Sequence, residues 1–267
     1  MLVDYEVDQT KTQQRWQALT AFYKDRAVLP APGFECANLP ECGPAFARHN
    51  GRPLPEGTRG CAAYVGPCYD AREKLSIVEV RLVIVGIDQG MTATDLDGRR
   101  RGILGLARTD LNTHMRGVER ILRVFFGESD RDLRLFNYYA MPNALKCAGG
   151  AMQWNRPFEM FAGCRGYLAS EFKILEPNIV ITQSHALAFE HFKATLESGG
   201  GEFELRARHP YADWWLMRHR PSGRDWHECH IVDSPHPRAC GPFYGQFLPF
   251  FQAELARSIR QCLGLSS

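Results

Sequence analysis

The feature that most restricts the fold is the run IVEVRLVIVG at residues 77–86, which has the composition of a strand. Its second half is β-branched and apolar, without the alternation of a strand that has one face in water. Such a run is typical of a parallel strand that is covered on both faces. The run leads into Gly86-Ile87-Asp88-Gln89-Gly90, a tight turn at the carboxyl end of the strand, where ligand sites of open α/β sheets are found. Asp88 is therefore a candidate for chemistry, and a cap or turn residue is the alternative.

Strand and helix patterns alternate along the rest of the chain. We expect further strands at residues 133–139, 177–182 and 227–232, and short strands or a hairpin at 202–208 and 213–217. Helical patterns cover residues 7–26, 184–196 and 246–263, and two more follow Asn112 and begin near Phe158. This order predicts an α/β fold, a three-layer αβα arrangement around a central, mostly parallel sheet of about four strands.

Length and charge set the broad class of protein. A chain of 267 residues that is 45% hydrophobic can bury one sizeable core, so we expect a single domain, with an N-terminal helix and cysteine-rich lobe at 1–76 and an α/β core at 77–267. The net charge of +2 neither demands nor excludes a polyanionic partner. No apolar run is long enough to span a bilayer, and the first residues are too polar for a signal peptide. We expect a monomeric cytoplasmic protein without membrane contact.

Four of the nine cysteines fall in one segment, residues 26–70, which prolines and glycines interrupt throughout. They are Cys36, Cys42, Cys61 and Cys68. The segment is expected to contain no long regular element, and a loop of this kind gains order when it is tied to a metal centre. In a reducing compartment ligation or burial is expected rather than disulfide bonding, so we predict that at least two of the four bind a metal. Four ordinary buried cysteines are the alternative.

A second pair of cysteines lies in the stretch MPNALKCAGGAMQWNRPFEMFAGC at residues 141–164. Cys147 and Cys164 have sixteen residues between them, too many for a zinc-knuckle pair. They converge if the loop at 148–157 folds back before the helix that begins near Phe158. Two thiolates need two more to hold a tetrahedral metal or an iron–sulfur cluster.

The segment 91–111 is polar and is interrupted by glycines, so we expect a loop. It contains the run Arg99-Arg100-Arg101. Three arginines in a flexible loop can contact phosphates, and a solvated loop is the alternative.

The order of these motifs resembles the uracil-DNA glycosylase superfamily, and within it the iron–sulfur branch. The matching stretches are Gly-Ile-Asp-Gln-Gly after the first strand, Pro-Asn-Ala-Leu-Lys-Cys after the next, a second cysteine near a helix start, and His-Pro after the last strand. The branch has Gly-x-x-Pro-Gly, Thr-Asn-Ala-Val-Lys-Cys and His-Pro-Ser at these places. The resemblance covers residues 81–238 and is most specific between Asn143 and Cys164.

This resemblance implies a DNA glycosylase that hydrolyses the N-glycosidic bond of uracil or a modified base flipped out of DNA. It places Asp88 where the attacking water is positioned, His236 where the departing base is supported, and Asn143 where the edge of the base is read. The other residues that it places around the substrate are Gly86, Ile87, Gln89, Ile103 and Arg238. It also implies a structural 4Fe–4S cluster whose ligands are Cys36, Cys42, Cys147 and Cys164, with Cys61 and Cys68 as the alternative N-terminal pair.

The sequence departs from the family pattern at several positions. Gln89 stands in place of a proline, Pro142 in place of a threonine, and Arg238 in place of a serine. No phenylalanine stands in the segment 91–111 to stack on the base, so Ile103 or Leu104 takes that place. Two other functions stay open: a glycosylase for a bulky modified cytosine, for example in defence against phage DNA, and an iron–sulfur or zinc protein that binds nucleic acid without cleaving it.

Overall fold

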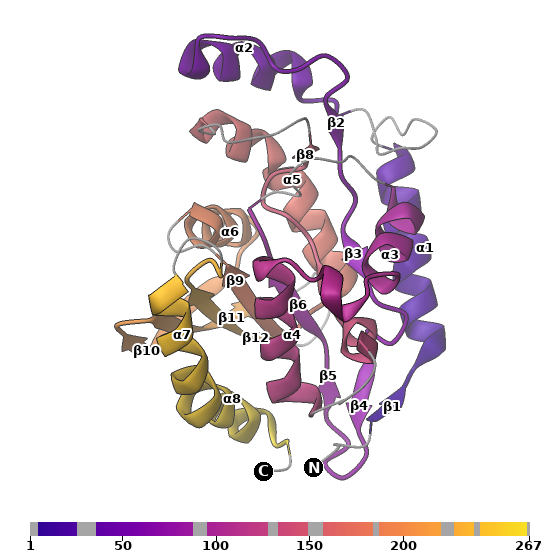
Figure 1. Cartoon of the computed structure of the whole chain (residues 1–267), viewed down its shortest axis with the longest axis vertical. Coiled ribbons are helices and arrows are strands. Elements are labelled where there is room, and N and C mark those ends of the chain that lie inside the picture. Colours follow the sequence, from indigo (N-terminus) through magenta and orange to yellow (C-terminus); the bar gives the residue numbers. More distant parts are fainter. Residues whose placement is uncertain are drawn as a thin grey trace.

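The computed structural model of the chain describes residues 5–25, 36–87, 95–127, 133–148, 157–183, 187–219, 227–237 and 241–265. Of residues 108, 187, 188, 191 and 241–244 it describes only the backbone. Figure 1 shows the arrangement of helices and strands along the chain.

A seven-stranded sheet in the order β10-β11-β12-β9-β6-β7-β3 forms the centre of the molecule. Its four middle strands are parallel: β12 (His227–Ser234), β9 (Ile179–Gln183), β6 (Leu82–Val85) and β7 (Tyr139–Met141). Antiparallel strands extend it, namely β10 (Glu202–His209) and β11 (Ala212–His219) on one side and β3 (Tyr64–Val65) on the other. The predicted α/β class is confirmed, whereas a sheet of four strands is wrong, because the hairpin and β3 join the same ladder.

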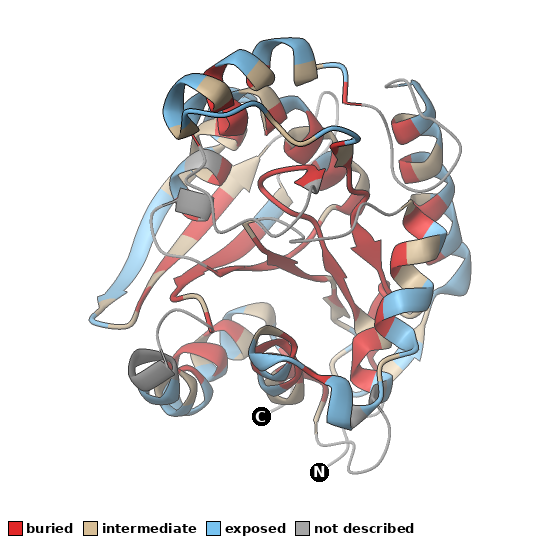
Figure 2. Ribbon diagram, turned by 45° about the horizontal axis from the view of Figure 1, so that its top comes forward, coloured by how far each residue is buried: buried red, intermediate tan, exposed pale blue. Residues whose placement is uncertain are grey.

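Helices cover both faces of this sheet (Figure 2). One hydrophobic cluster joins Val83, Val85 and Val180 of the strands to helices α1 (Gln9–Asp25), α2 (Leu39–Asn50), α5 (Phe158–Leu175) and α6 (Leu187–Glu197). A second joins Ile84 and Ile181 to α4 (Thr113–Phe126), the π-helical turn Phe251–Leu255 and α8 (Ala256–Leu263), which continues α7 (Gly241–Phe250). Because side chains alternate along a strand, the non-alternating apolar run supplies both clusters at once.

Two segments expected to be irregular are helical. The proline-rich segment contains α2, a helix of 12 residues. Pro40 stands in its first turn, where no backbone N–H is needed, and the helix also accommodates Pro44 in its interior. The polar segment around the arginines contains α3 (Leu96–Leu104), and the Asp95 side chain accepts a hydrogen bond from the Gly98 N–H at 2.6 Å to cap it. A one-turn 3-10 helix, Arg108–Asp110, precedes α4.

Two predicted strands have other boundaries. Residues Leu133–Tyr138 form a 3-10 helix, and only Tyr139–Met141 enter the sheet as β7. The run at 77–86 is divided into β5 (Glu79–Val80) and β6, because the Arg81 N–H donates to the Asn178 side chain at 2.8 Å instead of to a neighbouring strand. β5 belongs to a small sheet with β1 (Tyr5–Val7) and β4 (Ala71–Glu73), and a third sheet pairs β2 (Arg59–Gly60) with β8 (Cys147–Ala148).

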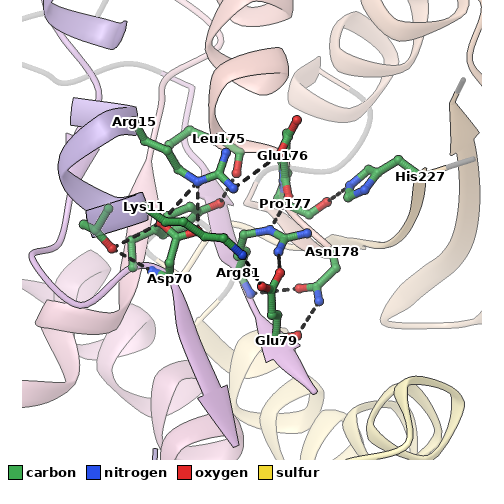
Figure 3. A network of polar contacts seen from close by, with 12 residues as sticks. Lys11, Arg15, Asp70, Glu79, Arg81, Leu175, Glu176, Pro177, Asn178 and His227 are labelled. Carbon is green, nitrogen blue, oxygen red and sulfur yellow. Dashed lines mark hydrogen bonds and ion pairs between the residues drawn. The ribbon is translucent and has the colours of Figure 1, made fainter. Parts of the chain in front are cut away.

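A polar network ties the amino-terminal edge of the sheet to α1 (Figure 3). Arg15 of α1 pairs with Asp70 at 2.9 Å and with Glu176 at 3.3 Å, and Arg81 donates to the Glu176 carbonyl at 2.5 Å. His227, at the start of β12, contacts the Pro177 carbonyl at 2.7 Å. Because these contacts occupy the amino-terminal ends of the parallel strands, we expect a site at their carboxyl-terminal ends. No helix within the described residues is long and apolar enough to cross a membrane.

Candidate active site and cysteine cluster

Gly86 and Asn143 hold neighbouring positions just beyond the carboxyl ends of β6 and β7. They form a parallel bridge that extends the pairing of β6 with β7. The Gly86 N–H donates to the Pro142 carbonyl at 3.2 Å, and the Ala144 N–H donates to the Gly86 carbonyl at 2.9 Å. A Cβ atom on Gly86 would lie 3.0 Å from Asn143 Oδ1, so the absence of a side chain makes room for the amide. The backbone thus places the Asn143 amide beside the turn that follows β6.

Two buried amide side chains at this edge have polar atoms without a hydrogen-bond partner among the described residues. Asn143 is 3% exposed and Gln183 is 0% exposed. Within the described residues, Asn143 Nδ2 and both amide atoms of Gln183 have no partner. Burying such a group unpaired costs about 1–3 kcal/mol, so a ligand that pairs with these amides offsets a real penalty.

The two amides lie on the same face of the sheet. The pairing of Val85 with Thr182 puts Gln183 beside Gly86. Two residues before Gln183 and Asn143, Ile181 and Met141 both belong to the cluster that α4 covers. Because side chains alternate along strands, Gln183 and Asn143 face α4 as well. Sequence reasoning missed Gln183, since a glutamine ending a strand carries no local sign of burial.

His236, which follows β12, stacks on His114 of α4. The ring centroids are 5.4 Å apart and the planes differ by 22°. Burial, followed by the positive charges of His236 and Arg99, lowers the pKa of His114 to about 4. His114 is therefore neutral near pH 7, and its Nδ1 has no partner among the residues that the structure describes. The sequence assigned His114 no role, because it stands where a helix simply begins.

The three consecutive arginines of α3 differ in environment. Arg99 is 4% exposed, and Arg101 is exposed to solvent. The Arg100 guanidinium lies 3.4 Å from the centroid of the Trp16 ring, and its Nε donates to the Val65 carbonyl at 2.9 Å. The solvated-loop alternative is therefore wrong for Arg99. Of the three arginines, only Arg101 is exposed, as an arginine must be to contact the phosphates of DNA.

The four cysteines predicted as ligands are all buried in one hydrophobic cluster. Burial, and then the nearby sulfurs of Cys164, Cys36, Cys42 and Cys61, raise the pKa of the Cys147 thiol. A Cβ atom on Gly163, next to Cys164 in α5, would lie 2.9 Å from Cys42 Sγ. The thiols of α2, β8 and α5 therefore lie near one another.

The donor set suits an iron–sulfur cluster, because thiolates are its usual ligands and the Lys146 N–H already donates to Cys164 Sγ at 3.4 Å. Within the described ranges, no three histidine, cysteine or acidic side chains form a metal-binding group. Cys61 stands close by, with its N–H donating to the Lys146 carbonyl at 2.7 Å, and Cys68 lies beside Arg100. The cluster stays a prediction.

A buried ion pair joins the asparagine-bearing segment to α5. Lys146 Nζ lies 2.5 Å from Glu171 Oε2, and both side chains are 0% exposed. The Tyr23 hydroxyl of α1 donates to the other Glu171 oxygen and accepts from the Ala63 N–H at 2.8 Å. Lys146 stands between Asn143 and Cys147, so this pair positions both.

The remaining predicted residues are placed only in part. Asp88, Gln89 and Arg238 lie outside the described residues. Ile87 is half-buried, and its carbonyl accepts a hydrogen bond from the Leu145 N–H at 2.7 Å. Ile103 is 9% exposed and belongs to the cluster beneath α4, so its contact with a base stays a prediction.

Comparison with protein-family models and with curated protein sequences finds no match to this chain.

Proposed function

We propose that the protein is a DNA glycosylase that hydrolyses the N-glycosidic bond of uracil or a modified base flipped out of DNA. The observation that carries this proposal is the buried Asn143 amide at the joined ends of β6 and β7, whose Nδ2 has no partner among the described residues. An asparagine amide offers a donor and an acceptor side by side, which suits the imide edge of uracil. A base must leave the duplex to be read in this way.

Asp88 and His236 are assigned the catalytic roles in the cleavage of the glycosidic bond. Cleavage builds positive charge on the sugar and negative charge on the leaving base. Asp88, one residue beyond Ile87, is assigned to the sugar side, where a carboxylate favours the cation and orients water. His236 is assigned to the base, and its stacking on His114 holds its ring in one orientation.

The cysteines are assigned a structural task. Cys36, Cys42, Cys147 and Cys164 would hold a 4Fe–4S cluster, which would supply rigidity rather than redox chemistry because hydrolysis moves no electrons. Its ligands would tie α2 and β8 to α5. Cys147 lies four residues after Asn143, so a cluster bound to Cys147 would also restrict the position of the Asn143 amide that reads the base.

Exposed arginines near the site are suited to the DNA backbone. Arg101 of α3 and Arg116 and Arg120 of α4 are exposed. Arg116 and Arg120 line a hollow of about 380 Å³ together with Leu111 and the ion pair of Glu119 with Arg123. Because helices α3 and α4 also carry Arg99 and His114, phosphate contacts made here place the target nucleotide at the strand ends.

The test is a single-turnover assay on oligonucleotides that carry uracil, 5-hydroxymethylcytosine or glucosylated cytosine. We expect release of one of these bases, and a loss of about 10²–10³-fold in rate for Asn143→Ala, as when one transition-state donor is removed. Asn50→Ala, whose side chain donates to the Phe46 carbonyl at the end of α2, is the matched control. Asp88→Ala tests the acid separately.

Two results would redirect the proposal. Binding of oligonucleotides without release of any base by the wild type would replace catalysis with the binding function. Release of modified cytosine but not uracil would identify the substrate as the bulkier base. Purified protein that is colourless and holds stoichiometric zinc would contradict the iron–sulfur assignment.

A further inference from the structure

Arg99 is a buried cation that has no partner of opposite charge among the described residues. Its Nη2 donates only to the Met141 carbonyl, at 3.5 Å, and Nε and Nη1 have no partner among the described residues. Burial lowers its pKa, and the nearby Cys61, Tyr139, Tyr23 and Glu171 act in the opposite direction. A single buried ion costs several kcal/mol unless it is paired.

The only carboxylate among these neighbours is already engaged. Glu171 pairs with Lys146 at 2.5 Å and accepts a hydrogen bond from Tyr23. Burial also raises the pKa of Tyr139, so this phenol stays neutral near Arg99. Within the described part of the chain, no carboxylate is therefore left to pair with the Arg99 guanidinium, which can meet the negative charge of a ligand.

The groups around Arg99 form a buried site rich in hydrogen-bond donors. Tyr139 Oη, His114 Nδ1 and Asn143 Nδ2 are likewise buried and unpaired within the described part of the chain. Met141, which Arg99 contacts, lies two residues before Asn143, and the Arg99 charge acts on His114. A cluster that offers guanidinium, phenol and amide hydrogens favours an anion or an oxygen-rich ligand.

We propose that Arg99 binds the departing base and stabilises the negative charge that develops on it. This inference rests on the proposed glycosylase function. The C1′–N bond breaks with both electrons moving to the base, whose carbonyl oxygens share the charge. Water adds to C1′ and loses a proton, and the base regains one on release. Arg99 interacts more strongly with the anion than with the neutral base, so it lowers the barrier rather than merely tightening binding.

A leaving-group comparison tests this role. One set of oligonucleotides carries uracil and the other carries the more acidic 5-fluorouracil. Each set is incubated with the wild type, Arg99→Gln, Arg99→Lys and the control Arg206→Gln, which alters an exposed arginine of β10. We expect Arg99→Gln to slow uracil release by about 10²–10³-fold and 5-fluorouracil release less, because a better leaving group needs less help. We expect Arg99→Lys to be intermediate and Arg206→Gln unchanged. Equal slowing of both bases, or none, would overturn the proposal.

A second measurement does not depend on turnover. We expect free 5-fluorouracil to raise the thermal midpoint of the wild type more at alkaline pH, where the base ionises, than at neutral pH, and Arg99→Gln to lose this difference. If the wild type cleaves neither oligonucleotide but shows the Arg99-dependent shift, the glycosylase function fails and the anion site stands. If wild type and Arg99→Gln shift equally, or neither shifts, the anion site fails.

Stability gives an independent check on folding. Because Arg99→Gln removes an unpaired buried charge, we expect its thermal midpoint without ligand to be no lower than that of the wild type, as is common where function opposes stability. A clear fall in this midpoint would show that Arg99 has a structural partner, and would count against the proposal.

Discussion

Removal of one member of the buried Lys146–Glu171 pair is the most quantitative test of this structure. Both side chains are 0% exposed and their charged atoms are 2.5 Å apart. Lys146→Met leaves the Glu171 carboxylate in the core without its ion-pair partner, where it keeps the hydrogen bond from the Tyr23 hydroxyl and the charge of the nearby Arg99. Breaking such a pair from one side destabilises a protein by about 3–5 kcal/mol. For a domain of this size, that loss corresponds to a fall in the thermal midpoint of about 6–20 °C.

The experiment is a double-mutant cycle with Lys146→Met, Glu171→Gln and both changes together, followed by thermal unfolding. We expect the double variant to be destabilised by less than the two single changes combined, because no unpaired charge remains. Lys11→Met is the matched control. Lys11 lies 2.7 Å from Glu79, but these side chains are 47% and 40% exposed, so the loss should be about 0–1 kcal/mol. If Lys146→Met costs no more than Lys11→Met, or if the two single effects add, the reasoning is refuted.

Three further predictions concern the site. Gly86→Ala puts a Cβ atom 3.0 Å from Asn143 Oδ1, so we expect base release in the single-turnover assay to fall more than thermal stability does; an unchanged rate would show that the amide position is not critical. Cys147→Ser should bleach the visible absorbance of the purified protein, and retained colour with unchanged iron and sulfide would exclude Cys147 as a ligand. Burial lowers the pKa of His114 and of His230 to about 4. Between pH 6.5 and 4 these histidines therefore bind more protons in the unfolded chain than in the folded protein. Each should reduce the free energy of unfolding by about 1.4 kcal/mol per pH unit as the pH falls. His230→Asn should flatten that decline in denaturant titrations at pH 7, 6 and 5, and an unaltered slope would contradict the assignment.

The elements that could be predicted from sequence are those whose signal is local. Helices α4 and α5 and the β10–β11 hairpin lie where apolar periodicity and turn residues indicated them. Helix α2 was missed because proline was taken to interrupt a helix, whereas α2 has Pro40 in its first turn and accommodates Pro44 in its interior. Helix α3 was missed because its single cap, Asp95, is the only local sign that a polar, glycine-containing segment turns into a helix.

The candidate site divides in the same way. Asn143, Cys147 and Cys164 were predicted because they stand in a motif that resembles a known family. Cys36 and Cys42 were predicted because four cysteines fall in one proline-rich segment and the resemblance calls for a second pair. His114, Gln183 and Arg99 were not, because each is an ordinary polar residue whose neighbours along the chain predict exposure. Arg99 and His114 are buried where α3 and α4 pack on the 3-10 helix Leu133–Tyr138 and, for α3, on β3, so residues from distant parts of the chain meet.

The sequence by itself determined the α/β class, since an apolar strand without alternation needs cover on both faces, and that requirement is written in consecutive residues. Only the tertiary structure decided which polar groups are buried without partners. The cost of burying the Arg99 guanidinium or the Gln183 amide depends on every atom that surrounds it, and those atoms come from segments far apart in the chain.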